Sequence, residues 1–331
     1  MKNERLAIIC ENYRNNMALL KSVFRWESAE MYAVCAAQLT GCRRVVGRDD
    51  LLEAKRILKA ETGVFSSFRS SGSLSVISAL AMSEYPTERM LEMKSMYQAL
   101  RESFGSSTYL AMAAVILSEL ISPNEAGPLV VRARELYNRM RSEHPFLTSS
   151  EDSVLAVLLA FSGKSDEELI GEMETTYTHL KASIHWADAD SVQTVSHILA
   201  LGDRPAMESA DRFLNLFQGL QADGHRYGRE YELSALAVLA ITEKAEGALL
   251  CDVQEANDFL GRQKGYGGVF GFTKKTRLMH AAMLVSLDDD TTAQAEAGVL
   301  SSTLAMMAAR QAAMCAVMAS VTAASVSARN S

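Results

Sequence analysis

RILKA (56–60), MYQAL (96–100), LYNRM (136–140), TYTHL (176–180) and LFQGL (216–220) are the strings that decide the fold of this chain. They place Ile57, Tyr97, Tyr137, Tyr177 and Phe217 at intervals of 40 residues, and the related string NDFLG (257–261) follows after a slip of two residues. A fixed period of this length indicates one supersecondary unit that is used repeatedly. We therefore expect a repeat protein.

Each repeat has two halves, which we name A and B. The A halves, such as SVLAVLLAF (153–161) and YELSALAVLAI (231–241), are apolar nearly all round, so a helix formed by them must be covered on every side. The B halves, such as TERMLEMKSMYQALRESF (87–104), put apolar residues at spacings of three and four on one side and charges elsewhere. The pattern predicts an all-α protein of repeated α-hairpins, forming a two-layer α-solenoid or α/α-toroid with inner A helices and outer B helices.

The period also predicts the domain organisation, a single helical-repeat domain over residues 1–331. A final helix over 291–328, rich in Ala, Met, Ser and Val, is expected to cap the last repeat, since Arg310 and Gln311 interrupt it and argue against a membrane anchor. The predicted repeats span residues 25–63, 64–103, 104–144, 145–184, 185–224, 225–266 and 267–290.

Composition limits the classes of partner. A net charge of −7 argues against binding nucleic acid through its phosphates. Charges interrupt the N-terminal segment too early for a secretory signal, and before the tail no apolar run is long enough for a membrane span. We therefore expect a cytoplasmic protein. The five cysteines show no CxxC spacing, which favours buried, reduced thiols.

The loops that lead from a B helix to the next A helix are the expected binding surface. They begin with an aromatic residue, continue with small polar residues and should share one end of the repeats, where the N-termini of the A helices attract anions. The same serines also serve as ordinary helix caps, and the basic residues as solvated surface charges. The candidate ligand-binding residues are Ser66, Ser67, Arg69, Arg229, Lys274, Lys275 and Arg277.

Catalysis is an alternative for the acidic residues in these loops. Glu151, Asp152, Asp188 and Asp190 come from equivalent places in adjacent repeats, where carboxylates could pair as acid and base or hold a cation. Acids in a first helical turn are equally explained as caps that complement the helix dipole.

Two histidines, His197 and His280, are further catalytic candidates. Both lie within apolar A halves, where a histidine needs a hydrogen-bond partner in the core or a cavity to point into. No HExxH or other metal-ligand spacing occurs, so no metal site is predicted. No cofactor and no oligomeric state is specified by the sequence.

Several longer strings are similar to a bacterial family, found mostly in Firmicutes, known as domain-of-unknown-function 4003. The resemblance extends from about Met17 to the tail. It implies a single-domain, helical, intracellular bacterial protein, and it implies no activity. The strings are TGVFSSFR (62–69), HPFLTSSEDSVLAVLLA (144–160), SHILALG (196–202), YELSALAVLAI (231–241), KGYGG (264–268) and KKTRLMHAAMLVS (274–286).

Two functions are therefore weighed. The first is a binding or scaffold module that holds a small molecule or a peptide on the face formed by the B-to-A loops. The alternative is an α/α-toroid enzyme that acts on a small, anionic substrate in a central funnel at the same loops.

Overall fold

A computed structural model describes residues 2–25, 27–42, 44–70, 72–267, 271–288 and 307–320. All regular elements in these ranges are helices, which confirms the all-α prediction. The α-helices are α1 (Glu4–Val23), α2 (Ala29–Thr40), α3 (Arg48–Glu61), α4 (Ser73–Met82), α5 (Pro86–Phe104), α6 (Thr108–Leu120), α7 (Ala126–Glu143), α8 (Asp152–Leu159), α9 (Asp166–Ser183), α10 (Ala189–Ala200), α11 (Ala206–Ala222), α12 (Leu233–Ala240), α13 (Glu246–Gly261) and α14 (Lys274–Ser286), with the 3₁₀ turns η1 (Ser67–Arg69) and η2 (Pro123–Glu125).

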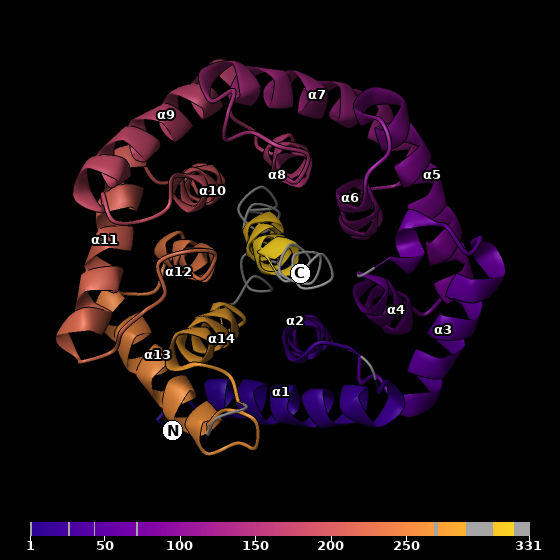
Figure 1. The fold of residues 1–331 in the computed structure, drawn as a ribbon, viewed down its shortest axis with the longest axis horizontal. Helices are drawn as coiled ribbons and strands as arrows, with labels where there is room; N and C mark the ends of the chain where they lie inside the picture. Colours follow the sequence, from indigo (N-terminus) through magenta and orange to yellow (C-terminus); the bar gives the residue numbers. More distant parts are fainter. Residues whose placement is uncertain are drawn as a thin grey trace, which may run out of the picture. The chain divides into compact units, whose positions relative to one another are not determined.

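The chain divides into two compact units. Unit 1 contains Met1–Glu11 and Phe161–Ala316, and unit 2 contains Asn12–Ala160 and Val317–Ser331. Within unit 2, α2 packs on α4 and α6 on α8 in an A layer, while α3 packs on α5 and α5 on α7 in a B layer (Figure 1). Within unit 1, α10, α12 and α14 form the A layer, and α9, α11 and α13 form the B layer.

The A helices are the buried ones, as their composition predicts. All eight residues of α12 are buried, and so are all eight residues of α8. The B helices bury one face only: in α3 the buried residues are Leu51, Ala54, Ile57 and Leu58. Burial of each large aliphatic side chain contributes about 1.5–3 kcal/mol, so the A helices and the apolar stripes of the B helices both stabilise the fold.

Polar residues begin the helices where the sequence suggests. Ser107, Asp188 and Thr273 are the N-caps of α6, α10 and α14, and each side chain accepts a hydrogen bond from a first-turn backbone N–H. Ser165 and Glu168 form the predicted capping box at the start of α9.

The residues at 40-residue intervals pack against aromatic residues at the preceding B-to-A connection. The ring centroids of Tyr97 and Phe68 are 5.3 Å apart, and those of Phe217 and Trp186 are 5.0 Å apart and stacked. Tyr137 contacts Phe104 edge-on at 5.6 Å. These pairs join the end of a B helix to a B-to-A loop, so the period reflects a packing contact rather than a site of chemistry.

The first residues of the chain, which the predicted repeats do not include, are part of unit 1. The side-chain amide of Asn3 donates to Asp288 at 2.6 Å and to Asp252 at 3.4 Å. The Asp288 carboxylate, whose side chain is 5% exposed, also pairs with Lys244 at 2.9 Å and with Arg5 at 3.5 Å. We name Asn3, Arg5, Lys244, Asp252 and Asp288 the Asp288 cluster. It fastens the N-terminal segment to α13 and to the end of α14.

The tail and the cysteines differ in part from expectation. Of the predicted helix 291–328, residues 307–320 are described and are helical, and the other residues lie outside the described ranges. Cys10, Cys35 and Cys315 are buried, but Cys251 is exposed on the B helix α13 and Cys42 is half-buried. Among the described helices, none has both the length and the apolar character needed to cross a membrane.

Candidate functional site

In unit 2, the candidate ligand-binding residues of the first B-to-A loop are engaged by the fold. The Ser66 hydroxyl caps the 3₁₀ turn η1, and the Arg69 guanidinium donates to the Thr62 carbonyl at 3.2 Å. The Ser67 hydroxyl lies 2.9 Å from the Tyr97 hydroxyl, which in turn lies 3.2 Å from the Ser106 hydroxyl of the next loop. This chain of hydroxyl groups ties two successive loops to one B helix.

The same loops of unit 2 present apolar side chains to solvent. Phe65 is 102% exposed and its neighbour Val64 is 74% exposed, while Phe146, two loops further on, is 99% exposed. A fully exposed phenylalanine gains nothing from the core. Aromatic side chains are frequent anchors of protein interfaces, so these two loops are candidate contact points.

In unit 1, the basic candidates differ in their exposure. Arg229 is exposed and lies over the Trp186 ring, with its guanidinium carbon 4.4 Å from the ring centroid. Lys274 and Lys275, in the first turn of α14, are also exposed. Arg277 is half-buried and donates to the Asn257 side chain at 2.8 Å, so its guanidinium holds α14 to α13.

Two of the acidic candidates, Asp152 and Asp188, accept hydrogen bonds from backbone N–H groups where their helices begin. In unit 2, the buried carboxylate of Asp152 accepts from the Ser149 N–H at 2.7 Å, and Glu151 contributes to raising the pKa of Tyr109, which burial raises most. In unit 1, Asp188 accepts from the Ser191 N–H at 3.2 Å. Asp190 is exposed in the first turn of α10.

Both candidate histidines are buried in A helices of unit 1. His197 is 3% exposed and His280 is 2% exposed. The Nδ1 atom of His280 lies 2.8 Å from the Tyr266 hydroxyl, and its ring is enclosed by the rings of Tyr266 and Phe272. Burial lowers the pKa of His280 to about 3, so the imidazole is neutral at physiological pH.

At the other end of the hairpins, cationic side chains cap the C-termini of A helices. In unit 1, the Lys164 ammonium donates to the Ala200 carbonyl at 3.0 Å and to the Gly202 carbonyl at 2.6 Å, at the end of α10. At the end of α12, Arg204 and Arg212 both donate to the Thr242 carbonyl, at 3.3 and 3.2 Å. Carbonyl groups at a helix C-terminus lack helical partners and carry partial negative charge, so these cations stabilise each A helix from the preceding A-to-B loop or B helix.

The sequence contains a signal for these caps outside the B-to-A loops. Arg44, Lys164, Arg204 and Lys244 are separated by 120, 40 and 40 residues, multiples of the same period. Each lies in a loop from an A helix to a B helix, and Arg44 of unit 2 donates to the Ala81 carbonyl at 2.6 Å.

Replacing Arg212 by alanine is expected to lower the free energy of unfolding by about 1.5 kcal/mol, the value of a hydrogen bond to a charged group. Its side chain is 11% exposed and bonds to two carbonyl groups at the end of α12, those of Thr242 and Lys244. Urea unfolding measures the change. Arg56→Ala, which removes a 70% exposed cation paired with Glu53, is the matched control and should change stability much less than Arg212→Ala does. Equal effects of the two changes would contradict the capping role.

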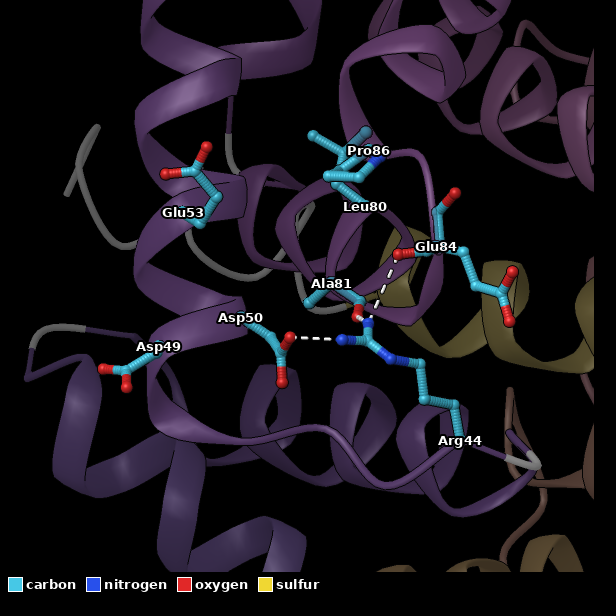
Figure 2. A pocket seen from close by; sticks show the side chains of 9 residues that line it. Arg44, Asp49, Asp50, Glu53, Leu80, Ala81, Glu84 and Pro86 are labelled. Atoms are coloured by element: carbon cyan, nitrogen blue, oxygen red, sulfur yellow. Dashed lines mark hydrogen bonds and ion pairs between the residues drawn. The ribbon is translucent and has the colours of Figure 1, made fainter.

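A pocket of about 320 Å³ lies beside the capped end of α4 in unit 2 (Figure 2). Besides its bonds to α4, Arg44 pairs with Asp50, whose other carboxylate oxygen accepts from the Gly47 N–H at 2.7 Å. The lining residues are Arg44, Asp49, Asp50, Glu53, Leu80, Ala81, Ser83, Glu84 and Pro86. The pocket therefore combines four carboxylates and one guanidinium with a partly apolar wall. In the part of the chain that the structure describes, no three His, Cys, Asp or Glu side chains form a group that could hold a metal ion.

In the described residues, the fold and these sites define an all-helical protein with buried A helices, whose C-termini are capped by cationic side chains of the same unit. Residues 16–313 match the family described as "Protein of unknown function (DUF4003)", and the chain belongs to this family, as the resemblance predicts. The chain is 23% identical over 257 residues to the uncharacterized protein YeaA of Bacillus subtilis (strain 168), a match that covers 75% of this chain and 77% of that protein. No solved structure matches the chain significantly.

Proposed function

We propose that this protein is a binding or scaffold module that contacts a peptide or protein partner through the B-to-A loops of unit 2. In this proposal, the hairpins of each unit are successive turns of a two-layer α-solenoid, which brings equivalent loops to one end. The observation that carries the proposal is the complete exposure of Phe65 and Phe146 in two of these loops.

Burial energetics favour a role in binding for these side chains. Transferring one exposed phenylalanine into an interface contributes roughly 1.5–3 kcal/mol, and aromatic anchors dominate many protein interfaces. The backbone around Phe65 is held by the capped turn η1 and by the bonds of Ser67 and Arg69, so little ordering is needed on binding.

The exposed cations of unit 1 are proposed as a separate contact for an anionic group. Lys274 and Lys275 extend from the first turn of α14, where the helix dipole also favours anions. Arg229, held over Trp186, is placed in the same role. The remaining candidates are proposed to support the B-to-A loops of their own unit rather than to touch a partner. They are Ser66, Ser67 and Arg69 in unit 2 and Arg277 in unit 1.

The enzyme alternative has weaker support. It requires a reactive group that a substrate can reach, whereas the histidine with a strongly lowered pKa, His280, is 2% exposed and enclosed by Tyr266 and Phe272. We therefore propose binding and no reaction.

Photo-crosslinking tests the proposal in the bacterium that encodes the protein. A photoreactive phenylalanine analogue at position 65 or 146 is expected to give a discrete adduct of higher mass. The matched control is the same analogue at position 85, where Tyr85 is 67% exposed in an A-to-B loop of the same unit. Adducts at 65 and 146 but not at 85 support the proposal. No adduct at either loop position, or equal adducts at all three, contradicts it.

A further inference from the structure

The three B-to-A loops of unit 2 differ in length. The first and the third span residues 62–72 and 144–151, whereas the second spans only residues 105–107. Gly105, with a φ of 85°, ends α5, and the Ser107 hydroxyl caps α6 two residues later. The second loop leads into α6, which packs on η1 of the first loop and on α8 (Figure 1). A short loop therefore lies between two longer ones.

Contacts within unit 2 hold these three loops in place. The chain of hydroxyl groups centred on Tyr97 ties the first loop to the second. Tyr137 joins the second to the third, because its ring lies 5.6 Å from that of Phe104 and its hydroxyl donates to the Ser149 carbonyl at 3.1 Å. The loops are thus ordered before a partner binds, which reduces the entropy lost on binding.

The surface made by the three loops has apolar ends and a polar middle. Phe65 and Phe146 mark the ends and are 102% and 99% exposed. Between them, Gly105 and Ser106 are exposed, and the space beside the Gly105 α-carbon is open. Packed helices are about 8–10 Å apart, so two helix spacings separate the two phenylalanines by roughly 20 Å. An extended chain covers this distance with about six residues.

We propose, on the basis of the proposed function, that the partner of these loops is an extended peptide segment. It has two apolar side chains about six residues apart, which contact Phe65 and Phe146, and small or uncharged polar residues between them. Its middle crosses the short second loop. An extended chain has N–H and C=O groups that can bond to the hydroxyls of Ser106 and Tyr97, whereas the backbone of a helix is already paired within itself.

Panning a phage-displayed library of random peptides on the full chain tests the inference. The peptides are twice as long as the expected segment, so that the spacing is free to vary. We expect the enriched sequences to share two apolar residues at about six positions apart, with few charges between them. The most enriched peptide, synthesised with a fluorescent label, is the probe for anisotropy titrations.

Variants of the full chain separate this inference from the proposed function. Phe65→Ser and Phe146→Ser should each weaken binding of the probe by about tenfold or more, since each removes one apolar contact. Ser106→Trp places a large side chain on the path of the peptide and should weaken binding by a similar factor. Tyr85→Ser and Ser95→Trp make the same changes at exposed positions of unit 2 outside these loops and should leave binding unchanged.

Weaker binding in all three loop variants, with unchanged binding in both controls, supports the inference. If the phenylalanine variants weaken binding and Ser106→Trp does not, the inference is overturned while the proposed function stands. If neither phenylalanine variant has an effect, both are overturned. Absence of any enriched peptide overturns the inference, and crosslinking then decides the proposed function by itself.

A second copy of the chain is the other occupant to be tested. If the wild type sediments as a dimer and Phe65→Ser as a monomer, the occupant is a second copy and the inference is overturned. Far-UV circular dichroism confirms that each variant is folded. The spacing of the apolar residues in the enriched peptides keeps the test decisive if Ser106→Trp does not fold.

Discussion

Asp288→Ala is expected to lower the free energy of unfolding by about 3 kcal/mol, at the lower end of the cost of removing one member of a buried ion pair. The Asp288 side chain is 5% exposed and accepts from Asn3 at 2.6 Å while pairing with Lys244 at 2.9 Å. The change leaves the partly buried Lys244 with Asp252 as its carboxylate partner and removes the acceptor of Asn3. Urea unfolding at pH 7 measures the loss.

A double-mutant cycle with Asn3→Ala shows whether the N-terminal segment shares this energy. If Asn3 acts through Asp288, the double variant should be less destabilised than the sum of the two single variants, by about 1 kcal/mol. Asp223→Ala removes an exposed carboxylate at the end of α11 and is the control. An effect of Asp288→Ala no larger than that of Asp223→Ala would show that the Asp288 cluster does not fasten the N-terminal segment.

Acidic pH is expected to lower the free energy of unfolding through His280, by about as much as Asp288→Ala does. Burial lowers the pKa of His280 to about 3, whereas an unfolded histidine has the ordinary value of 6.5. Between these values the unfolded chain binds a proton and the folded chain does not, so stability falls as the pH drops below 6.5. At pH 4.5, two pH units below the unfolded value, the contribution is roughly 3 kcal/mol.

His280→Asn isolates this contribution, because asparagine keeps a polar group near the Tyr266 hydroxyl but does not titrate. The loss of stability between pH 7 and pH 4.5 should be smaller in this variant than in the wild type by roughly 3 kcal/mol. His185→Asn makes the same substitution at an exposed histidine and is the control. If the free energy of unfolding of His280→Asn falls with pH as steeply as that of the wild type, the buried imidazole is protonated in the fold and the account is wrong.

The sequence predicts the helical fold well because the fold depends on local composition. SVLAVLLAF is apolar on every side and forms the buried α8. TERMLEMKSMYQALRESF has one apolar stripe, and α5 buries Met90, Met93, Met96 and Leu100. The capping box of Ser165 and Glu168 follows from two residues three positions apart. These features can be predicted from residues that are close together in the sequence.

The candidate sites were harder to predict, because they depend on contacts between distant residues. Asn3 and Asp288 are 285 positions apart, and no local pattern links them. Some residues predicted to bind a ligand bond instead to B helices: Ser67 to Tyr97, and Arg277 to Asn257. The first B-to-A loop contains two phenylalanines with opposite environments. Phe68, inside the turn η1, is buried, whereas Phe65, just before the turn, is exposed. One signal for the A-to-B end of the hairpins is present in the sequence. It is the periodic spacing of the cations Arg44, Lys164, Arg204 and Lys244.

The central claim is that Phe65 and Phe146, exposed on two B-to-A loops of unit 2, contact a peptide or protein partner. Photo-crosslinking at these two positions in the full chain tests it most directly, with position 85 as the control. We predict an adduct of the same mass at positions 65 and 146 and none at position 85. No adduct at 65 and 146, or equal adducts at all three positions, would contradict the account.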